Sequence, residues 1–154
     1  MRMRYFEDLV IGQVEESAPL TVDREAMLAF ARQYDPQYFH ADVEDAKRST
    51  FGGLIASGIY TMALWRQLDH AIAHDIAWIC GIAWDHVRFP RALRAGDTIR
   101  ARAQCLSKRE SRKEPGRGVV VYEYELFNQR DELVFTCRST NLVERRATAA
   151  TAAG

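Results

Sequence analysis

The chain has 154 residues, of which 47% are hydrophobic, and its 21 Lys and Arg residues balance 21 Asp and Glu residues. This size and composition predict one globular domain, and the zero formal net charge argues against nucleic acid as the main partner, because such partners usually require a strongly basic face. The sequence contains no uncharged apolar run of about 20 residues, the length that a membrane-spanning helix needs, and no signal-peptide pattern, so we expect a cytoplasmic protein without a membrane partner.

The first elements predicted along the chain are a strand and a helix. Residues 13–22 alternate loosely between polar and apolar and are broken by Pro19, which indicates a short strand. Residues 24–34 place their apolar side chains on one face of a helix, and Thr21 and Asp23 are candidate N-caps. Pro36 then disfavours helical backbone at Asp35, so we expect irregular chain or a short turn over 35–40, followed by one or two helical turns over 42–48.

The longest helical pattern runs from residue 54 to about residue 74. Its first half is apolar on nearly all sides, and this predicts burial on most sides, as when a sheet wraps around the helix. Arg66, Asp69 and His70 make the second half polar, which distinguishes this helix from a membrane span.

Beyond residue 75 the hydrophobic period changes from 3.6 to 2, which predicts strands. The predicted strands are 76–89, 99–105, 119–127 and 133–143, with a hairpin turn at 128–132 and loops at 90–97 and 107–118. We expect the second loop to be long and mobile, and the small residues of 147–154 to form a disordered tail. Residues 1–146 thus form a single α+β domain, in which a curved antiparallel sheet wraps around one long central helix.

The three cysteines, Cys80, Cys105 and Cys137, lie far apart in segments predicted as strands. They lack the C-x-x-C spacing of zinc and redox sites, so we expect buried, reduced thiols. His70 and His74 are four residues apart on the long helix, but no third ligand stands at a recognised spacing, and we expect a solvated face and no metal site.

Asp35 and His40 are the best candidates for catalysis. Pro36 forces a turn between them, and on a bent chain this spacing can bring a carboxylate and an imidazole together. Such a pair can hold a water molecule and exchange its protons near neutral pH. A capping aspartate with a structural histidine would give the same pattern.

The glycines around the start of the long helix are the second candidate site. Gly53 precedes the predicted helix and Gly58 lies one turn inside it. The N–H groups of a helix N-terminus favour an anionic oxygen, and glycine lets a substrate approach the backbone. Ser57 can donate a hydrogen bond to a ligand or bond back to the helix, and close helix–sheet packing would also explain Gly58.

Arg88, Arg91 and Arg94 form the best candidate for binding phosphate, because guanidinium groups match phosphate oxygens. Solvated loop arginines would give the same spacing. The Gly-x-Ser-x-Gly, Walker and Rossmann motifs are absent from the sequence, which argues against the enzyme classes that depend on them.

Three segments, YDPQYFH at 34–40, FGGLIASG at 51–58 and VRFPRALRAGD at 87–97, resemble the MaoC-like dehydratases, which include the (R)-specific enoyl-CoA hydratases. The resemblance covers about residues 5–143 and implies the hot-dog fold. It also implies reversible addition of water to a trans-2-enoyl-CoA, which gives a (3R)-hydroxyacyl-CoA, in a homodimer or an oligomer of dimers. This chain departs from the family pattern in three places. Gln37-Tyr38-Phe39 stands where many members have Asn and Pro, Pro36 directly follows the aspartate, and Ser57 stands where many hydratases have a second histidine.

Carried over by this resemblance, Asp35 and His40 match the pair that activates water, and Gly58 matches the glycine whose N–H binds the thioester oxygen. The acyl-CoA is the substrate, and no cofactor is implied. Two other activities remain open: a hot-dog acyl-CoA thioesterase, and a non-catalytic acyl-binding subunit of a two-chain hydratase.

Overall fold

The computed structural model describes residues 1–147, so the tail predicted for 147–154 lies, except for its first residue, outside the described residues. The described residues form eleven elements, of which the first is a short 3-10 helix near the N-terminus. In chain order these are η1 (Phe6–Asp8), β1 (Val14–Glu16), β2 (Leu20–Thr21), α1 (Arg24–Tyr34), α2 (Tyr38–Ala41), α3 (Val43–Ala46), α4 (Gly58–Ala73), β3 (Trp78–Arg88), β4 (Thr98–Glu110), β5 (Arg117–Phe127) and β6 (Leu133–Glu144).

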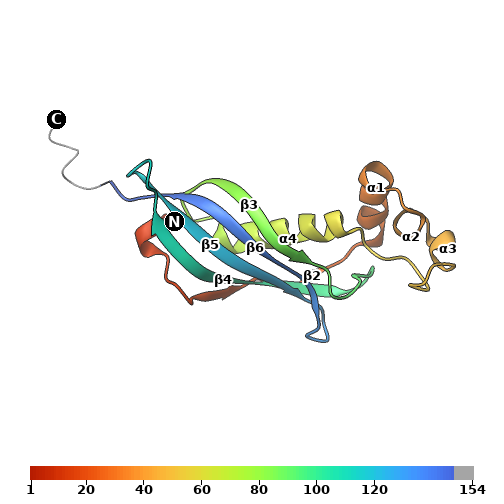
Figure 1. Cartoon of the computed structure of the whole chain (residues 1–154). Helices are drawn as coiled ribbons and strands as arrows, with labels where there is room; N and C mark the ends of the chain where they lie inside the picture. Colours follow the sequence, from red (N-terminus) through yellow and green to blue (C-terminus); the bar gives the residue numbers. More distant parts are fainter. Residues whose placement is uncertain (148–154) are drawn as a thin grey trace.

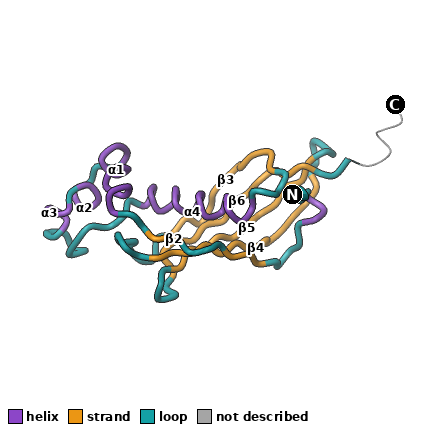
Figure 2. Tube along the Cα trace, turned by 180° about the vertical axis from the view of Figure 1, so that it is seen from behind, coloured by secondary structure: helices purple, strands orange, loops and turns teal. Residues whose placement is uncertain are grey.

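The strands form one curved antiparallel sheet with the order β1-β4-β5-β6-β3, and β2 pairs with the far end of β4. The sheet curls along one side of α4, the long helix (Figure 1). From behind, α4 runs along the concave face with the strands beyond it (Figure 2). This arrangement confirms the predicted α+β architecture of a sheet wrapped around one long helix.

The core is centred on Trp65 of α4, whose side chain is fully buried. Its ring lies 5.0 Å from the ring of Tyr124 on β5, 5.4 Å from that of Phe135 on β6 and 5.1 Å from that of Trp84 on β3. Aromatic rings bury large apolar areas, so this cluster contributes strongly to the packing of helix on sheet.

The three short helices α1, α2 and α3 gather at the end of the molecule where α4 begins (Figure 1). Helix α1 has the bounds predicted from the sequence, and the side chain of its N-cap Asp23 accepts a hydrogen bond from the N–H of Ala26. The Asp42 carboxylate caps α3 in the same way, by accepting from the N–H groups of Glu44 and Asp45. The predicted turns over 42–48 are therefore confirmed.

The predicted start of the long helix at Leu54 is wrong, because α4 begins at Gly58. Tertiary hydrogen bonds hold the preceding segment extended: the N–H of Ile55 donates to the carbonyl of Phe39, and the N–H of Ala56 donates to that of Leu93. Gly58 is consequently the first residue of the helix and not an interior one. Residues 52–53 belong to a separate turn, whose first glycine has a φ of +67°.

Three further expectations need correction, about a loop, the burial of the long helix and the burial of the cysteines. Half of the predicted loop 107–118 is strand, because β4 continues to Glu110 and pairs there with Gly118 of β5. One side of α4 is open, with Ile59 53% exposed, because β3 ends the sheet beside it. Of the three cysteines, Cys105 and Cys137 are buried as predicted, whereas Cys80 on this edge strand is exposed.

No helix within residues 1–147 is long and apolar enough to cross a lipid bilayer.

Gly118 on β5 is required for packing against the N-terminal 3-10 helix. A Cβ at this position would lie 2.2 Å from the ring of Phe6, which is buried. We expect Gly118→Ala to lower the free energy of unfolding by about 1–3 kcal/mol, because overpacking forces the ring to move. Urea denaturation measures the change.

Gly116→Ala is the matched control, since a Cβ there meets no atom within 4 Å. We expect it to leave the free energy of unfolding unchanged or to raise it slightly by restricting the unfolded chain. Equal destabilisation by the two substitutions would contradict this account of Gly118.

Candidate active site

The Asp35 carboxylate is held by one donor on each oxygen. It is the C-cap residue of α1, and Pro36 turns the chain away from the helix there. Ser57 Oγ donates to Oδ2 at 2.7 Å, and Gln37 Nε2 donates to Oδ1 at 3.1 Å. The hydrogen bond from Ser57 is the main cause that lowers the pKa of Asp35 below its ordinary value, against the opposing effect of burial. Asp35 is therefore ionised at neutral pH.

The His40 imidazole is buried, and its orientation is fixed by the backbone. Nδ1 lies 2.8 Å from the carbonyl oxygen of Ile55, and because a carbonyl only accepts, Nδ1 carries the proton of this bond. In the neutral ring Nε2 is then an acceptor. The sequence predicted irregular chain or a short turn over 35–40, and His40 lies on the four-residue helix α2. It is only 6% exposed, because this helix packs against the segment before α4.

Nε2 of His40 and Oδ2 of Asp35 face each other across 3.8 Å. This distance is too long for a direct hydrogen bond, and both atoms are acceptors when the imidazole is neutral. A water molecule has two protons to donate and fits between two such acceptors. The structure thus brings the predicted pair together in an arrangement suited to holding and polarising water.

A mostly apolar cavity of about 300 Å³ opens beside His40. Its lining residues are Phe39, His40, Phe51, Ile55, Ala56, Gly58, Thr61, Phe89, Arg91, Ala92 and Leu93. As the first residue of α4, Gly58 has an N–H without an acceptor in its own helix, at the end that favours negative charge. A Cβ on Gly58 would lie 3.0 Å from the half-exposed ring of Phe89, so any other residue here would require this ring to shift.

Ser57 is nearly fully buried and has two roles at this point. Its hydroxyl oxygen accepts from the N–H of Ile59, which caps α4, and its hydroxyl proton is donated to Asp35. The sequence left open whether Ser57 meets a ligand or its own helix. In the structure it contacts the helix and the carboxylate, and it does not line the cavity.

The remaining predicted site residues are not all brought together. Gly53 does not line the cavity; it lies against Arg94, whose Nη1 would be 3.5 Å from a Cβ there. Arg91 lines the cavity and pairs with Glu132 at 2.9 Å. Arg94 Nη2 donates to the carbonyl of Phe51, and Arg88 is exposed at the end of β3, outside the cavity lining.

Sequence reasoning missed three residues that shape the site. Gln37, which orients Asp35, stands two positions after it, and this proximity was a usable signal. Ile55 acts through its carbonyl, so its side chain gives no indication of the role. Phe89 was assigned only to a strand, and its position over Gly58 depends on the tertiary fold.

The chain is similar in sequence to known proteins. The model of the MaoC like domain family matches residues 7–125. The chain is 32% identical over 143 residues to an uncharacterised protein of Bacillus subtilis, covering 90% of this chain and 98% of that one. It is also 32% identical over 108 residues to 3-hydroxyacyl-thioester dehydratase Z of Mycobacterium tuberculosis, covering 64% of this chain and 72% of the relative.

Solved structures show the same fold. The MaoC-like dehydratase from Rhodospirillum rubrum superposes with a TM-score of 0.87 at 34% identity, covering 94% of this chain and 99% of that chain. A Mycobacterium tuberculosis protein described as a double hot-dog fold superposes with a TM-score of 0.79 at 18% identity, covering 94% of this chain and 45% of the other. The fold of this chain is the hot-dog fold.

The hydrogen bond from Ser57 to Asp35 predicts a measurable pKa change. We expect Ser57→Ala to raise the pKa of Asp35, because it removes the strongest donor to the carboxylate, and Gln37→Ala to raise it less. Carboxyl ¹³C NMR titration measures both. An unchanged Asp35 pKa in Ser57→Ala would contradict the proposed role of the hydroxyl.

The lowered pKa of Asp35 also affects the stability of the fold. A carboxyl group whose pKa is lowered in the folded state stabilises the fold above its unfolded-state pKa, and this stabilisation is lost as the pH falls through the folded-state pKa. We expect Ser57→Ala to remove part of this stabilisation at neutral pH. The lost helix cap should lower the free energy of unfolding by about 1 kcal/mol more.

Proposed function

The chain belongs to the family of MaoC-like dehydratases, and from this membership we propose that it is an acyl-thioester hydratase and dehydratase. The proposed reaction adds water to a trans-2-enoyl-CoA and gives a (3R)-hydroxyacyl-CoA, or runs in reverse. The observation that carries the proposal is the pair of fixed acceptors, His40 Nε2 and Asp35 Oδ2, which face each other across 3.8 Å beside the cavity.

The water molecule of the proposed reaction is held between Asp35 and His40. It donates one proton toward the ionised carboxylate and the other toward Nε2 of the imidazole, which the Ile55 carbonyl keeps in the required tautomer. The water oxygen bonds to C3 of the enoyl group while one of its protons passes to Nε2. General acid–base catalysis of this kind typically contributes about 10²–10⁴-fold to the rate.

The electron pair of the C2=C3 bond moves toward the thioester oxygen as the water adds, which gives an enolate. We assign the N–H of Gly58 as the donor to this oxygen, since the start of α4 favours negative charge there. The proton on His40 then returns to C2, so that one hydrogen and one hydroxyl group have been added. A preorganised donor of this type is typically worth about 2.7–4 kcal/mol in the transition state.

For the CoA part of the substrate we propose that Arg88, Arg91 and Arg94 contact phosphate groups. Arg91 is the leading candidate because it lines the cavity. Arg94 holds the Phe51 carbonyl beside the cavity and Arg88 lies farther along β3, so their contacts would be to the more distant phosphates. The proposed chemistry uses side chains and backbone of this chain and needs no cofactor.

The first experiment follows the enoyl-thioester absorbance of crotonyl-CoA and a longer trans-2-enoyl-CoA while free thiol is monitored in parallel. We expect the absorbance to fall without thiol release. Thiol release would identify a thioesterase instead. The absence of both signals would favour the non-catalytic acyl-binding subunit over the proposed enzyme.

Asp35→Asn and His40→Gln test the catalytic pair. We expect each to lower the hydration rate by at least about 100-fold, because each removes a group that binds or deprotonates the water. His70→Gln, at an exposed position of α4, is the matched control and should keep the wild-type rate. Circular dichroism checks that the variants fold, and wild-type turnover in either catalytic variant would refute the assignment.

We further propose that two copies pair through β3. This strand is the edge of the sheet, and it exposes the apolar side chains of Ile79, Ile82, Trp84 and Val87. An open apolar edge strand readily pairs with another strand. A second copy related by two-fold symmetry would continue the sheet and cover the open side of both helices α4.

Ile82→Lys tests this interface, since Ile82 is 56% exposed on β3. A lysine on each copy would place two charges in the paired edge, so we expect a dimer to become a monomer in size-exclusion chromatography with light scattering. Ile11→Lys, at a turn residue that is 57% exposed, is the control and should leave the dimer intact. A wild-type monomer would contradict the proposal.

A further inference from the structure

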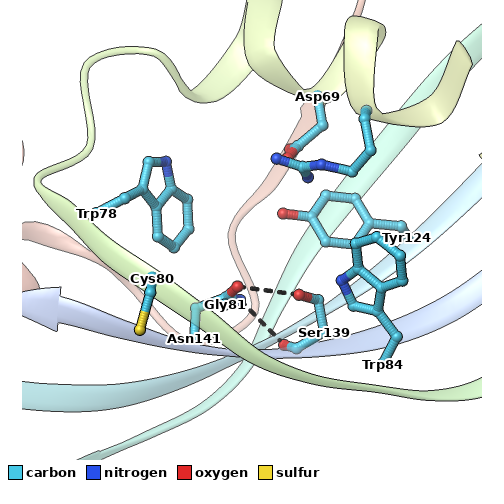
Figure 3. Close-up of a pocket in the computed structure, with 9 residues that line it drawn as sticks. Asp69, Trp78, Cys80, Gly81, Trp84, Tyr124, Ser139 and Asn141 are labelled. Carbon is cyan, nitrogen blue, oxygen red and sulfur yellow. Dashed lines mark hydrogen bonds and ion pairs between the residues drawn. The ribbon is translucent and has the colours of Figure 1, made fainter. Parts of the chain in front are cut away.

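A second cavity, of about 220 Å³, lies between α4 and the strands β3, β5 and β6 (Figure 3). Its lining residues are Arg66, Asp69, Trp78, Cys80, Gly81, Trp84, Tyr124, Ser139 and Asn141. None of them belongs to the candidate active site. The cavity differs from that site because buried polar groups and two tryptophan rings form its walls.

Asp69, on the α4 wall, carries one of two buried polar atoms that lack a hydrogen-bond partner among residues 1–147. Arg66 Nη1 pairs with Oδ2 of Asp69 at 2.5 Å, and the hydroxyl of Tyr124 also faces this carboxylate. Oδ1 nevertheless has no donor within hydrogen-bond distance, although this side chain is only 4% exposed. The other atom is Nε1 of Trp65, one turn earlier on the helix. Buried polar atoms without partners cost free energy, so a bound group that supplies a donor to Asp69 would be stabilised here.

The charges and polar groups of the cavity favour a neutral ligand. Arg66 and Asp69 cancel each other in charge, and the remaining polar side chains are neutral. The Ser139 hydroxyl donates to Oδ1 of Asn141 at 3.0 Å, so these two side chains already satisfy each other in part. The hydroxyl of Tyr124 points into the space between Trp78 and Trp84 (Figure 3). A hydroxyl group, which both donates and accepts, matches these walls better than an ion does.

This cavity lies on the same face of α4 as the candidate active site. Gly58 and Asp69 are eleven residues apart, which returns a helix to nearly the same angle after three turns and about 16 Å of rise. Half-exposed apolar side chains lie on α4, on β3 and directly after β3. Ile59 is 53%, Trp84 49% and Phe89 46% exposed.

We propose that the second cavity binds a hydroxyl group near the far end of the acyl chain of the substrate, and this inference rests on the proposed function. The thioester oxygen lies at the N–H of Gly58, the chain follows the apolar strip between α4 and β3, and its hydroxyl group donates to Oδ1 of Asp69. The helix rise between these residues corresponds to a chain of roughly ten carbons. In the proposed dimer the partner's β3 closes the outer side of this path.

The test compares 10-hydroxydecanoyl-CoA with decanoyl-CoA, saturated thioesters that cannot be hydrated. Isothermal titration calorimetry measures their dissociation constants. We expect the hydroxylated thioester to bind at least about tenfold more tightly, the size of one hydrogen bond to a charged acceptor. All three tryptophans of the chain line the cavity or pack against it, so intrinsic fluorescence reports binding at this place.

Asp69→Leu should abolish the preference and leave decanoyl-CoA binding nearly unchanged, because it removes the acceptor and keeps the volume. Tyr124→Phe, which removes one cavity hydroxyl, should reduce the preference and provides the test if the first variant does not fold. Gln67→Leu, at an exposed neighbouring position of α4, is the matched control and should retain the preference.

The outcomes separate this inference from the proposed function. Equal binding of the two thioesters by the wild-type protein, or a preference that persists in both Asp69→Leu and Tyr124→Phe, overturns the inference while crotonyl-CoA hydration still supports the function. Failure to bind either thioester, together with no turnover of any enoyl-CoA, overturns both.

Discussion

The buried hydroxyl of Ser57 connects the end of α1 to the start of α4. It accepts from the N–H of Ile59, which fixes where α4 begins, and donates to Asp35, which stabilises the ionised carboxylate. Because the helix begins there, the N–H of Gly58 is left without a helical acceptor at the mouth of the cavity. One side chain therefore sets both the position of the carboxylate and the position of the N–H that we propose as the donor to the thioester oxygen.

The curvature of the sheet accounts for where cavities form. The strands bury α4 through the aromatic cluster around Trp65, but β3 ends the sheet and leaves one side of the helix open. Both cavities lie along that side, one at the start of α4 and the other near Asp69. The same open edge supports the proposals of a dimer and of a path for an acyl chain, so the proposed assembly and the proposed chain recognition both depend on one edge strand, β3.

Much of the fold was predictable from local patterns. The bounds of α1 followed from its apolar periodicity and the cap Asp23, and the hairpin between β5 and β6 followed from alternation on either side of a polar turn. The start of α4 was not predictable, because residues 54–57 have a helical pattern but make tertiary hydrogen bonds instead. The N–H groups of Ile55 and Ala56 donate to the carbonyls of Phe39 and Leu93. The exposure of Cys80 likewise depends on which strand lies at the edge, and alternation within a strand does not determine this.

For the candidate site, the sequence by itself determined the chemistry: a carboxylate and an imidazole five residues apart around a proline, and glycines before an apolar helix. Only the tertiary structure decided how they act, because the protonated nitrogen of His40 depends on the carbonyl of Ile55, fifteen residues away. It also decided that Gly58 and not Gly53 stands at the helix start, and that Arg91 alone of the three arginines lines the cavity. Sequence patterns specify residue types and local periodicity, whereas hydrogen bonds between distant segments fix the orientation of each group.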